Sequence, residues 1–158
     1  RALAIPFQII PGVTATAACA ALLESELTLP AVSQTVILTR YASKSEMPAG
    51  EQLADLARHG ATMAIHLGVV HLKKIVAELL PHYGTDCPIA VVHRATWPDQ
   101  DWVLGSLDDI VQRVQAKGFR RTALILVGRV LGAEDFADSA LYQAGTQHLF
   151  RAPHTLDG

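Results

Sequence analysis

Three loops of this chain place small or polar residues directly after apolar runs. The first is Pro11-Gly12-Val13-Thr14-Ala15, the second is Leu67-Gly68, and the third covers 93–99 (HRATWPD). In open α/β sheets, ligands gather beyond the strand ends in loops of this kind. The three loops are therefore the candidate ligand-binding segments.

The first loop combines a glycine with the expected start of a helix. Gly12 permits unusual backbone angles and the close approach of a ligand. Thr14 offers a hydroxyl, and the helix that follows offers free N–H groups. An ordinary strand-to-helix turn with a threonine cap also explains these residues, and local physics alone favours that turn.

The other two loops have simple structural explanations beside the functional one. Gly68, taken alone, is most simply a turn glycine. The third loop brings together Arg94, Trp97 and Asp99, a cation, a ring and a carboxylate. Packing explains Trp97, and a turn after Pro98 explains Asp99.

Other catalytic patterns are missing from the sequence. No serine lies in a GxSxG elbow, and there is no Walker loop, GxGxxG or HExxH. His66 alternates with Ile65 and Leu67 in an expected strand, so a buried or half-buried histidine with a hydrogen-bond partner explains it better than a metal ligand. Cys19 and Cys87 lie too far apart in sequence to suggest zinc. We expect no metal and assign no catalytic residue.

Composition favours one folded domain. The 158 residues are 50% hydrophobic and 18% charged, with a formal net charge of -2. This charge balance does not indicate nucleic acid or a membrane as a partner. We interpret Arg120-Arg121 as part of a solvent-exposed connection between a helix and a strand. No apolar run reaches the ~20 residues of a membrane span. Two reduced cysteines and no signal peptide predict a cytoplasmic protein.

Apolar periodicity predicts strands that alternate with helices, which indicates an α/β domain. The expected strands cover 7–10, 34–40, 62–67, 88–94, 102–106 and 122–127, and the expected helices cover 14–23, 51–59, 70–83 and 107–117. We place the domain at 1–132 and a tail at 133–158, with a short helix near 133–137. Because the chain begins at Arg1 and runs almost at once into the first strand, we expect preceding residues to be absent.

Together, the segments PGVTA, SQTVILTR, TMAIHLG, PIAVVHRATWPDQ and ALILVGRVL resemble the C-terminal lobe of the tetrapyrrole (corrin/porphyrin) methylases. LTLPAVSQTVILTR and ATWPD are similar to the branch that methylates carbon 11 of precorrin-4 or cobalt-precorrin-4 in cobalamin biosynthesis. EDFADSALYQAGTQHLFR resembles the oxygen-dependent form. The resemblance implies a mixed sheet flanked by helices, in one lobe of a two-lobed enzyme.

The resemblance also implies a cofactor and the residues that hold it. S-adenosyl-L-methionine would lie between the lobes and leave as S-adenosyl-L-homocysteine. The residues implied to hold it are Pro11, Gly12, Thr14, Ala15, Leu67, Ala95 and Thr96, with Leu67 where relatives often have methionine. Arg40 is implied to face the acidic macrocycle, a tetrapyrrole, although a solvated strand-end arginine is the simpler explanation. Family members are similar in forming homodimers.

Two other functions stay open. One is a sister methylase that acts on cobalt-precorrin-4, uroporphyrinogen-III or diphthine. The other is a non-catalytic lobe for ligand binding or dimerisation. Because the family's N-terminal lobe is missing from the sequence, we expect this chain to be inactive alone.

Overall fold

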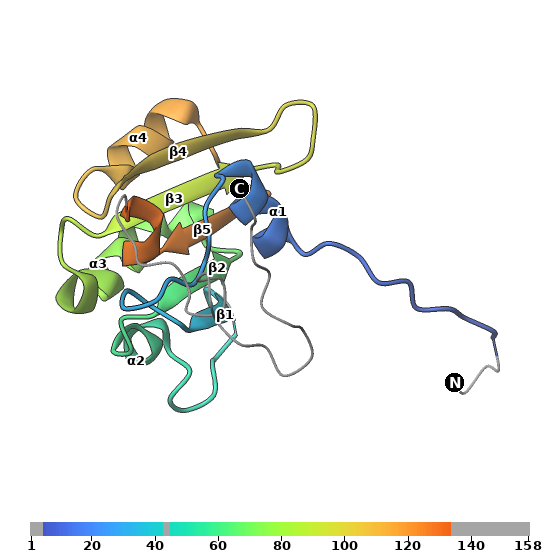
Figure 1. Cartoon of the computed structure of the whole chain (residues 1–158), viewed down its shortest axis with the longest axis horizontal. Helices are drawn as coiled ribbons and strands as arrows, with labels where there is room; N and C mark the ends of the chain where they lie inside the picture. The colour runs from blue at the N-terminus through green and yellow to red at the C-terminus, as the bar shows by residue number, and fades with distance from the viewer. Residues whose placement is uncertain (1–4, 43–44, 134–158) are drawn as a thin grey trace, which may run out of the picture.

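Strands and helices alternate along the chain, as the computed structural model of residues 5–42 and 45–133 shows (Figure 1). The strands are β1 (Val36–Arg40), β2 (Thr62–His66), β3 (Pro88–His93), β4 (Asp101–Ser106) and β5 (Ala123–Val127). The helices are α1 (Ala15–Leu22), α2 (Leu53–Ala57), α3 (Leu72–Tyr83) and α4 (Ile110–Lys117), with 3-10 turns η1 (Val69–His71) and η2 (Arg129–Gly132). The expected α/β class is confirmed.

The strands form one mixed sheet in the order β1-β2-β5-β3-β4. Only β1 and β2 pair in parallel, and the other three pairings are antiparallel. β1, β2 and β3 therefore run in one direction, and β4 and β5 run in the other. One end of the sheet gathers the carboxyl ends of three strands and the amino ends of two.

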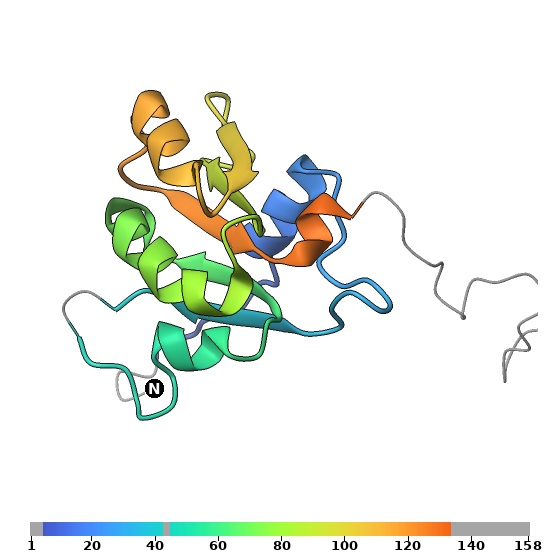
Figure 2. The same cartoon turned by 90° about the vertical axis from the view of Figure 1, so that its left-hand side faces the viewer.

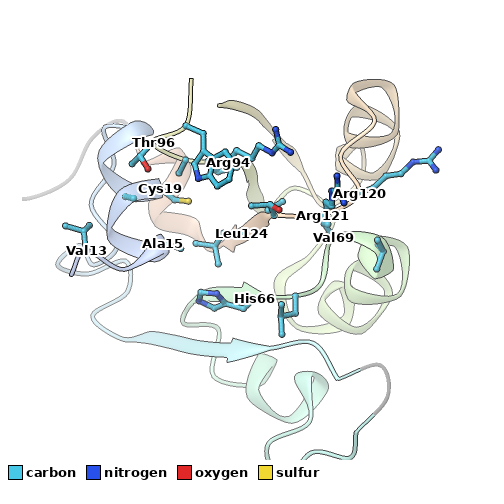
Figure 3. Close-up of a pocket in the computed structure, with 18 residues that line it drawn as sticks. Val13, Ala15, Cys19, His66, Val69, Arg94, Thr96, Arg120, Arg121 and Leu124 are labelled. Carbon is cyan, nitrogen blue, oxygen red and sulfur yellow. The ribbon is translucent and has the colours of Figure 1, made fainter. Parts of the chain in front are cut away.

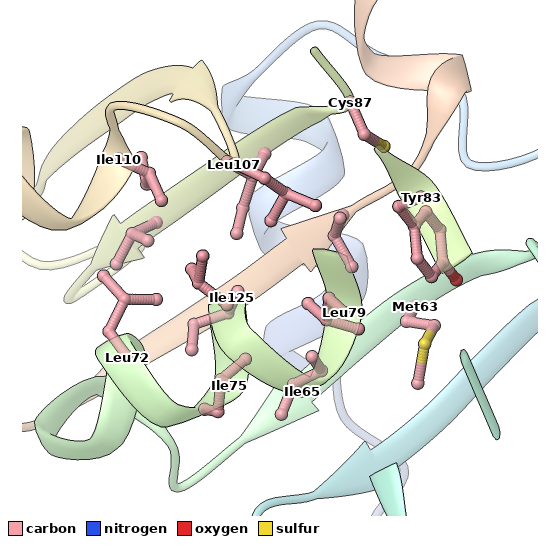
Figure 4. Packing of buried hydrophobic residues seen from close by; sticks show 14 of the residues in the cluster. Met63, Ile65, Leu72, Ile75, Leu79, Tyr83, Cys87, Leu107, Ile110 and Ile125 are labelled. Atoms are coloured by element: carbon pink, nitrogen blue, oxygen red, sulfur yellow. The ribbon is translucent and has the colours of Figure 1, made fainter. Parts of the chain in front are cut away.

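Helices cover both faces of this sheet. α2, α3 and α4 lie on one face, and α1 with η2 lies on the other (Figure 2). Side chains alternate between the faces along each strand, so Met63 and Ile65 enter the larger core while Ala64 faces α1. Figure 4 shows Ile75 and Leu79 of α3 packed on Ile65 and its neighbours in the larger core.

The smaller core has small side chains on both sides. Ala64 and Ala90 of the sheet are fully buried there, and Cys19 of α1 is 1% exposed. Small residues let a helix backbone approach a sheet closely, and alanine also favours the helix itself. The alanine-rich sequence of α1 thus sets both its structure and its position.

The strand expected at 7–10 is wrong. These residues are not in a strand, and Phe7 and Ile9 are 67% and 83% exposed. No described strand lies beside them, so their backbone groups lack the pairing that defines a strand. The remaining expected strands and helices are present with slightly different ends. The short helix expected at 133–137 and the tail lie, apart from Ala133, outside the described residues.

Among the described residues, no helix has both the length and the apolar composition that crossing a bilayer requires.

Candidate functional site

A cavity of about 610 Å³ opens where β2 and β3 end and β5 begins (Figure 3). Its lining comes from four segments: 13–19 around the start of α1, 66–70 from the end of β2, 92–97 from the end of β3, and 120–124 around the start of β5. Small-molecule sites in proteins are commonly clefts of roughly 300–1,000 Å³. This cavity is therefore the candidate binding site.

Small and apolar side chains dominate its walls. Ala15, Ala18, Ala95 and Ala123 line it, and so does Leu67, whose side chain is 74% exposed. Alanine walls let a flat ring come close to the backbone, and an exposed leucine beside them offers an apolar contact. The lining fits a nucleoside-sized ligand with an apolar ring face.

Backbone strain gathers around the same cavity. In the described part of the chain, six non-glycine residues have positive φ, and four of them line the cavity: Leu67 (57°), Arg94 (51°), Thr96 (71°) and Thr122 (53°). A left-handed conformation costs an L-residue ~1–2 kcal/mol, most clearly a β-branched one such as threonine. Strain of this kind clusters at functional sites, where the surrounding structure holds it in place.

The loop after β3 is fixed by several hydrogen bonds. The N–H of Trp97 donates to the carbonyl of Arg94 at 3.0 Å, and the N–H of Thr96 donates to Gln100 Oε1 at 2.8 Å. The Arg94 guanidinium pairs with Asp99 and lies 5.2 Å from the centre of the Trp97 ring. The loop is therefore preformed, and Arg94, Trp97 and Asp99, singled out in the sequence, do contact one another.

The loop before α1 reaches the cavity only in part. Thr14 Oγ1 accepts a hydrogen bond of 3.2 Å from the N–H of Ala17, so Thr14 is the helix cap. Pro11 and Gly12 are exposed, and a Cβ added to Gly12 would meet nothing within 4 Å. Ala15 lines the cavity, whereas these three residues are not in its wall.

The other implied cofactor residues gather at one place. Leu67, Ala95 and Thr96 line the cavity with Ala15. Gly68 supports Leu67 because a Cβ there would lie 2.5 Å from Ile75 Cδ1 and 3.2 Å from Ile125 Cδ1. Gly68 is therefore a site of close packing as well as a turn. Whether these residues bind the implied cofactor stays a prediction.

Residues 120–124 line the cavity although the sequence analysis did not select them. β5 runs antiparallel to β2 and β3, so the connection that precedes it lies at the same end as the loops that follow them. Arg120 and Arg121, interpreted as a solvated connection, are part of the cavity wall. In the sequence, the only sign of this part of the site is a pair of basic residues before an apolar strand. Those residues can be assigned to the cavity only when the direction of β5 in the sheet is known.

A second, more open cavity of about 590 Å³ adjoins the first. It is lined by Leu38, Thr39, Arg40, Met47, Glu51, His66 and Leu67. His66 and Leu67 belong to both linings, so they form the boundary between the cavities. Arg40 thus lies beside the first cavity and not in it.

The described residues contain no group of three or more His, Cys, Asp or Glu side chains arranged to hold a metal ion. Cys19 lines the first cavity, but burial raises the pKa of its thiol to about 11. A thiol with that pKa is protonated near neutral pH and is a poor nucleophile. The site is suited to binding and positioning a ligand.

Known proteins similar to this chain share its fold and much of its sequence. A precorrin-4 C(11)-methyltransferase of Pseudomonas aeruginosa is 70% identical over 96% of this chain and 60% of its own length. A cobalt-precorrin-4 C(11)-methyltransferase of Methanocaldococcus jannaschii is 47% identical over 95% of this chain and 58% of its own. The solved structure of a cobalt-precorrin-4 methyltransferase matches with a TM-score of 0.76 and 41% identity, over 78% of this chain and 52% of that one.

This chain spans about 60% of the length of the curated relatives it matches. The family model described as Tetrapyrrole (Corrin/Porphyrin) Methylases matches residues 1–111. The family-model match includes three of the four segments that line the cavity, 13–19, 66–70 and 92–97. The chain belongs to the tetrapyrrole (corrin/porphyrin) methylase family.

Proposed function

We propose that this chain forms the C-terminal part of a methyltransferase that acts on carbon 11 of precorrin-4 in cobalamin biosynthesis. The donor is S-adenosyl-L-methionine, and the product is S-adenosyl-L-homocysteine. The observation that carries the proposal is the 610 Å³ cavity, because Ala15, Leu67, Ala95 and Thr96 gather in its wall. The similarity to precorrin-4 C(11)-methyltransferases supports the choice of acceptor.

The residues of the cavity fit an adenosine group. S-adenosyl-L-methionine, when bound, supplies a methyl group activated on a sulfonium. Ala15 and Ala95 leave space for the ring, and Leu67 gives it an apolar contact. The N–H of Thr96 already donates to Gln100, so the backbone of Ala95 is the group left to meet the adenine edge.

The chain's own contribution is positioning. Leu67, Arg94, Thr96 and Thr122 hold strained backbone around the cavity before any ligand arrives. Fixed walls reduce the entropy lost when donor and acceptor are aligned, and alignment alone supplies much of the rate gain in such reactions. The reaction therefore needs no protein nucleophile.

The acceptor occupies the second cavity in this proposal. A reduced tetrapyrrole carries several carboxylates, and Arg40 provides a guanidinium whose geometry matches a carboxylate. Arg40 pairs in register with His66 on the neighbouring strand, so its cavity adjoins the proposed cofactor site. Arg40→Gln in the complete gene product should raise KM for the tetrapyrrole and leave the Kd for S-adenosyl-L-homocysteine unchanged.

Binding of S-adenosyl-L-homocysteine, measured by calorimetry on the complete gene product, tests the cofactor site. Ala95→Leu should weaken binding at least ~10-fold, since its added atoms enter the adenine space. Ala116→Leu on the exposed face of α4 is the matched control and should bind like wild type. Unchanged affinity in Ala95→Leu would remove Ala95 from the proposed site.

Methyl transfer to a panel of acceptors tests the substrate. Precorrin-4 should be methylated faster than cobalt-precorrin-4 or uroporphyrinogen-III. A preference for cobalt-precorrin-4, the acceptor in the name of the Methanocaldococcus jannaschii relative, would identify the sister activity instead. The 158-residue chain by itself should show no turnover, and clear turnover would contradict its expected dependence on further residues.

A cytoplasmic homodimer is part of the proposal. Cys19 and Cys87 are buried free thiols, which fits a reducing compartment. Two-fold pairs are the commonest oligomers of soluble enzymes. Cell fractionation and sedimentation equilibrium of the complete gene product test these two statements, and a periplasmic fraction or a monomeric mass would refute them.

A further inference from the structure

His66 lies at the boundary of the two cavities. It ends β2, pairs in register with Arg40 of β1, and follows Ala64 by two residues, which places it on the sheet face that carries α1. It lines both the 610 Å³ and the 590 Å³ cavity. Figure 3 shows its imidazole on the cavity wall below Ala15 and Leu124.

The imidazole of His66 has no partner among the described residues. It makes no hydrogen bond, ion pair or ring contact there, although it is half-buried. By contrast, the ring of His71 lies 5.4 Å from that of Tyr41, and the ring of His93 stacks on Phe119 at 4.8 Å. The sequence alone favours a histidine with a hydrogen-bond partner at this position, but no described side chain bonds to the imidazole. Its nitrogens are left for a ligand.

We propose that His66 accepts the proton that the tetrapyrrole releases when it is methylated. This inference rests on the proposed function. The methyl group passes from the first cavity to the second, and among the residues that the structure describes only His66 and Leu67 line both. Leucine cannot take a proton, whereas a neutral imidazole can.

The step balances without a further reactant. The C=C electron pair of an enamine unit in the reduced macrocycle forms the new bond to the methyl carbon. The C–S bond of the donor breaks with its pair on sulfur, and the enamine nitrogen becomes an iminium N–H. That proton then passes to a ring nitrogen of His66, which leaves a neutral C=N bond and an imidazolium.

Several ionisable side chains share these cavities with His66. They are Arg40 and Glu51 in the second cavity, and Cys19, Arg94, Arg120 and Arg121 in the first. Arginines stay protonated and cannot act as bases, and burial raises the pKa of Cys19 to about 11, which keeps that thiol protonated. Glu51, an exposed carboxylate, is the competing candidate.

The test uses the complete gene product and His66→Gln, which keeps a polar side chain but cannot take up a proton. For wild type, kcat/KM for the tetrapyrrole should fall on the acidic side, because a base that is already protonated cannot accept the released proton. His66→Gln should lose that acidic fall and reduce kcat by about 10²–10⁴-fold. Its Kd for S-adenosyl-L-homocysteine should stay within about threefold of wild type, since the adenosine contacts are intact.

Three further measurements separate a proton acceptor from a structural residue. Added imidazole should restore part of kcat to His66→Ala. The ring nitrogens of ¹⁵N-labelled His66 should shift in NMR spectra when uroporphyrin, an unreactive carboxylated tetrapyrrole, is added. His82→Gln, at an exposed position in the last turn of α3, should behave like wild type in every assay.

Each result decides between the hypotheses. If His66→Gln keeps both kcat and the acidic fall while wild type turns over, the assignment to His66 is wrong. If Glu51→Gln removes the acidic fall instead, Glu51 is the base. If wild type neither binds S-adenosyl-L-homocysteine nor methylates any tetrapyrrole, the proposed function fails, whatever His66 does.

Discussion

The backbone N–H of Arg94 donates a hydrogen bond of 2.9 Å to the carbonyl oxygen of Thr122. Arg94 and Thr122 both have left-handed backbone, with φ of 51° and 53°. The bond lies one step beyond the last β3–β5 pair, His93 and Ala123, so it extends the ladder into the loops. Two walls of the cavity are thereby fixed to each other.

Thr122→Gly should relieve strain without loss of stability. Glycine adopts φ near +53° freely, which recovers ~1–2 kcal/mol of left-handed strain, while its extra unfolded-state entropy costs ~0.5–1 kcal/mol. We expect the free energy of unfolding to rise by ~0–1.5 kcal/mol and the affinity for S-adenosyl-L-homocysteine to fall as the loop loosens. Urea unfolding and calorimetry measure the two effects.

Thr39→Gly is the control for Thr122→Gly. Thr39 lies inside β1, where glycine costs about 1 kcal/mol relative to a residue with a side chain. A destabilisation of Thr122→Gly as large as that of Thr39→Gly would contradict the strain argument.

The Arg94–Asp99 pair should matter more for binding than for stability. The side chains are 27% and 56% exposed, and exposed pairs contribute only ~0–1 kcal/mol to folding. Arg94→Met and Asp99→Asn should each weaken S-adenosyl-L-homocysteine binding, because the pair orders the loop that carries Ala95. The double variant should bind S-adenosyl-L-homocysteine no more weakly than the single variant with the lower affinity. A double-mutant cycle measured by calorimetry tests this.

Arg58→Met with Asp55→Asn is the matched control cycle. This ion pair, 3.5 Å long, lies on and just beyond α2, and neither residue lines the cavity. Equal losses of affinity in the two cycles would mean that the Arg94–Asp99 pair has no special role at the site.

Gly68→Ala and Gly12→Ala should differ sharply. The Cβ at Gly68 would clash with Ile75 and Ile125, so we expect ~1–3 kcal/mol of destabilisation from overpacking. The Cβ at Gly12 would meet nothing, so its change should stay within ~0.5 kcal/mol. Chemical denaturation tests both variants. If Gly68→Ala left the free energy of unfolding unchanged, the turn after β2 would be able to shift and accommodate the added Cβ.

Acid should destabilise the fold through three aspartates. The Arg129 guanidinium lowers the pKa of Asp86, Lys117 lowers that of Asp101, and the N–H of Ser106 with Arg113 lowers that of Asp109. A carboxyl whose pKa is depressed on folding stabilises the protein above its unfolded value of 3.8 and loses that contribution as pH falls through the folded value.

The Tm of wild type should therefore fall as pH drops below about 3.8, and thermal unfolding followed by circular dichroism will show the decline. Asp101→Asn should have a lower Tm at neutral pH and a shallower decline in acid. A decline as steep as that of wild type would mean that Asp101 makes no such contribution.

Local sequence patterns predicted most of the fold because its strands and helices have strong local signals. β-branched residues are frequent in β1 and β3, and glycines end helices and strands, as Gly84 does after α3. The segment 7–10 has the same apolar character but lies beside no described strand, and pairing cannot be read from composition.

The candidate site was only half predictable for a related reason. Ala15, Leu67, Ala95 and Thr96 were selected because they follow strands or start a helix, and all four line the cavity. Residues 120–124 lie just before and at the start of β5, and they reach the cavity because β5 is antiparallel to its neighbours. His66 was not selected, because a single sequence cannot show whether an imidazole has a hydrogen-bonding partner in the folded protein.

The position of β5 also has a consequence for synthesis on the ribosome. β5 is the last described strand along the chain, yet it lies in the centre of the sheet and joins β2 to β3. Until residue 127 has left the ribosomal exit tunnel, β5 cannot join the β1–β2 pair to the β3–β4 pair. The apolar faces of the two pairs remain exposed during that time. The described strands thus stay in two separate half-sheets until β5 emerges, and a stop codon before residue 123 would leave them so.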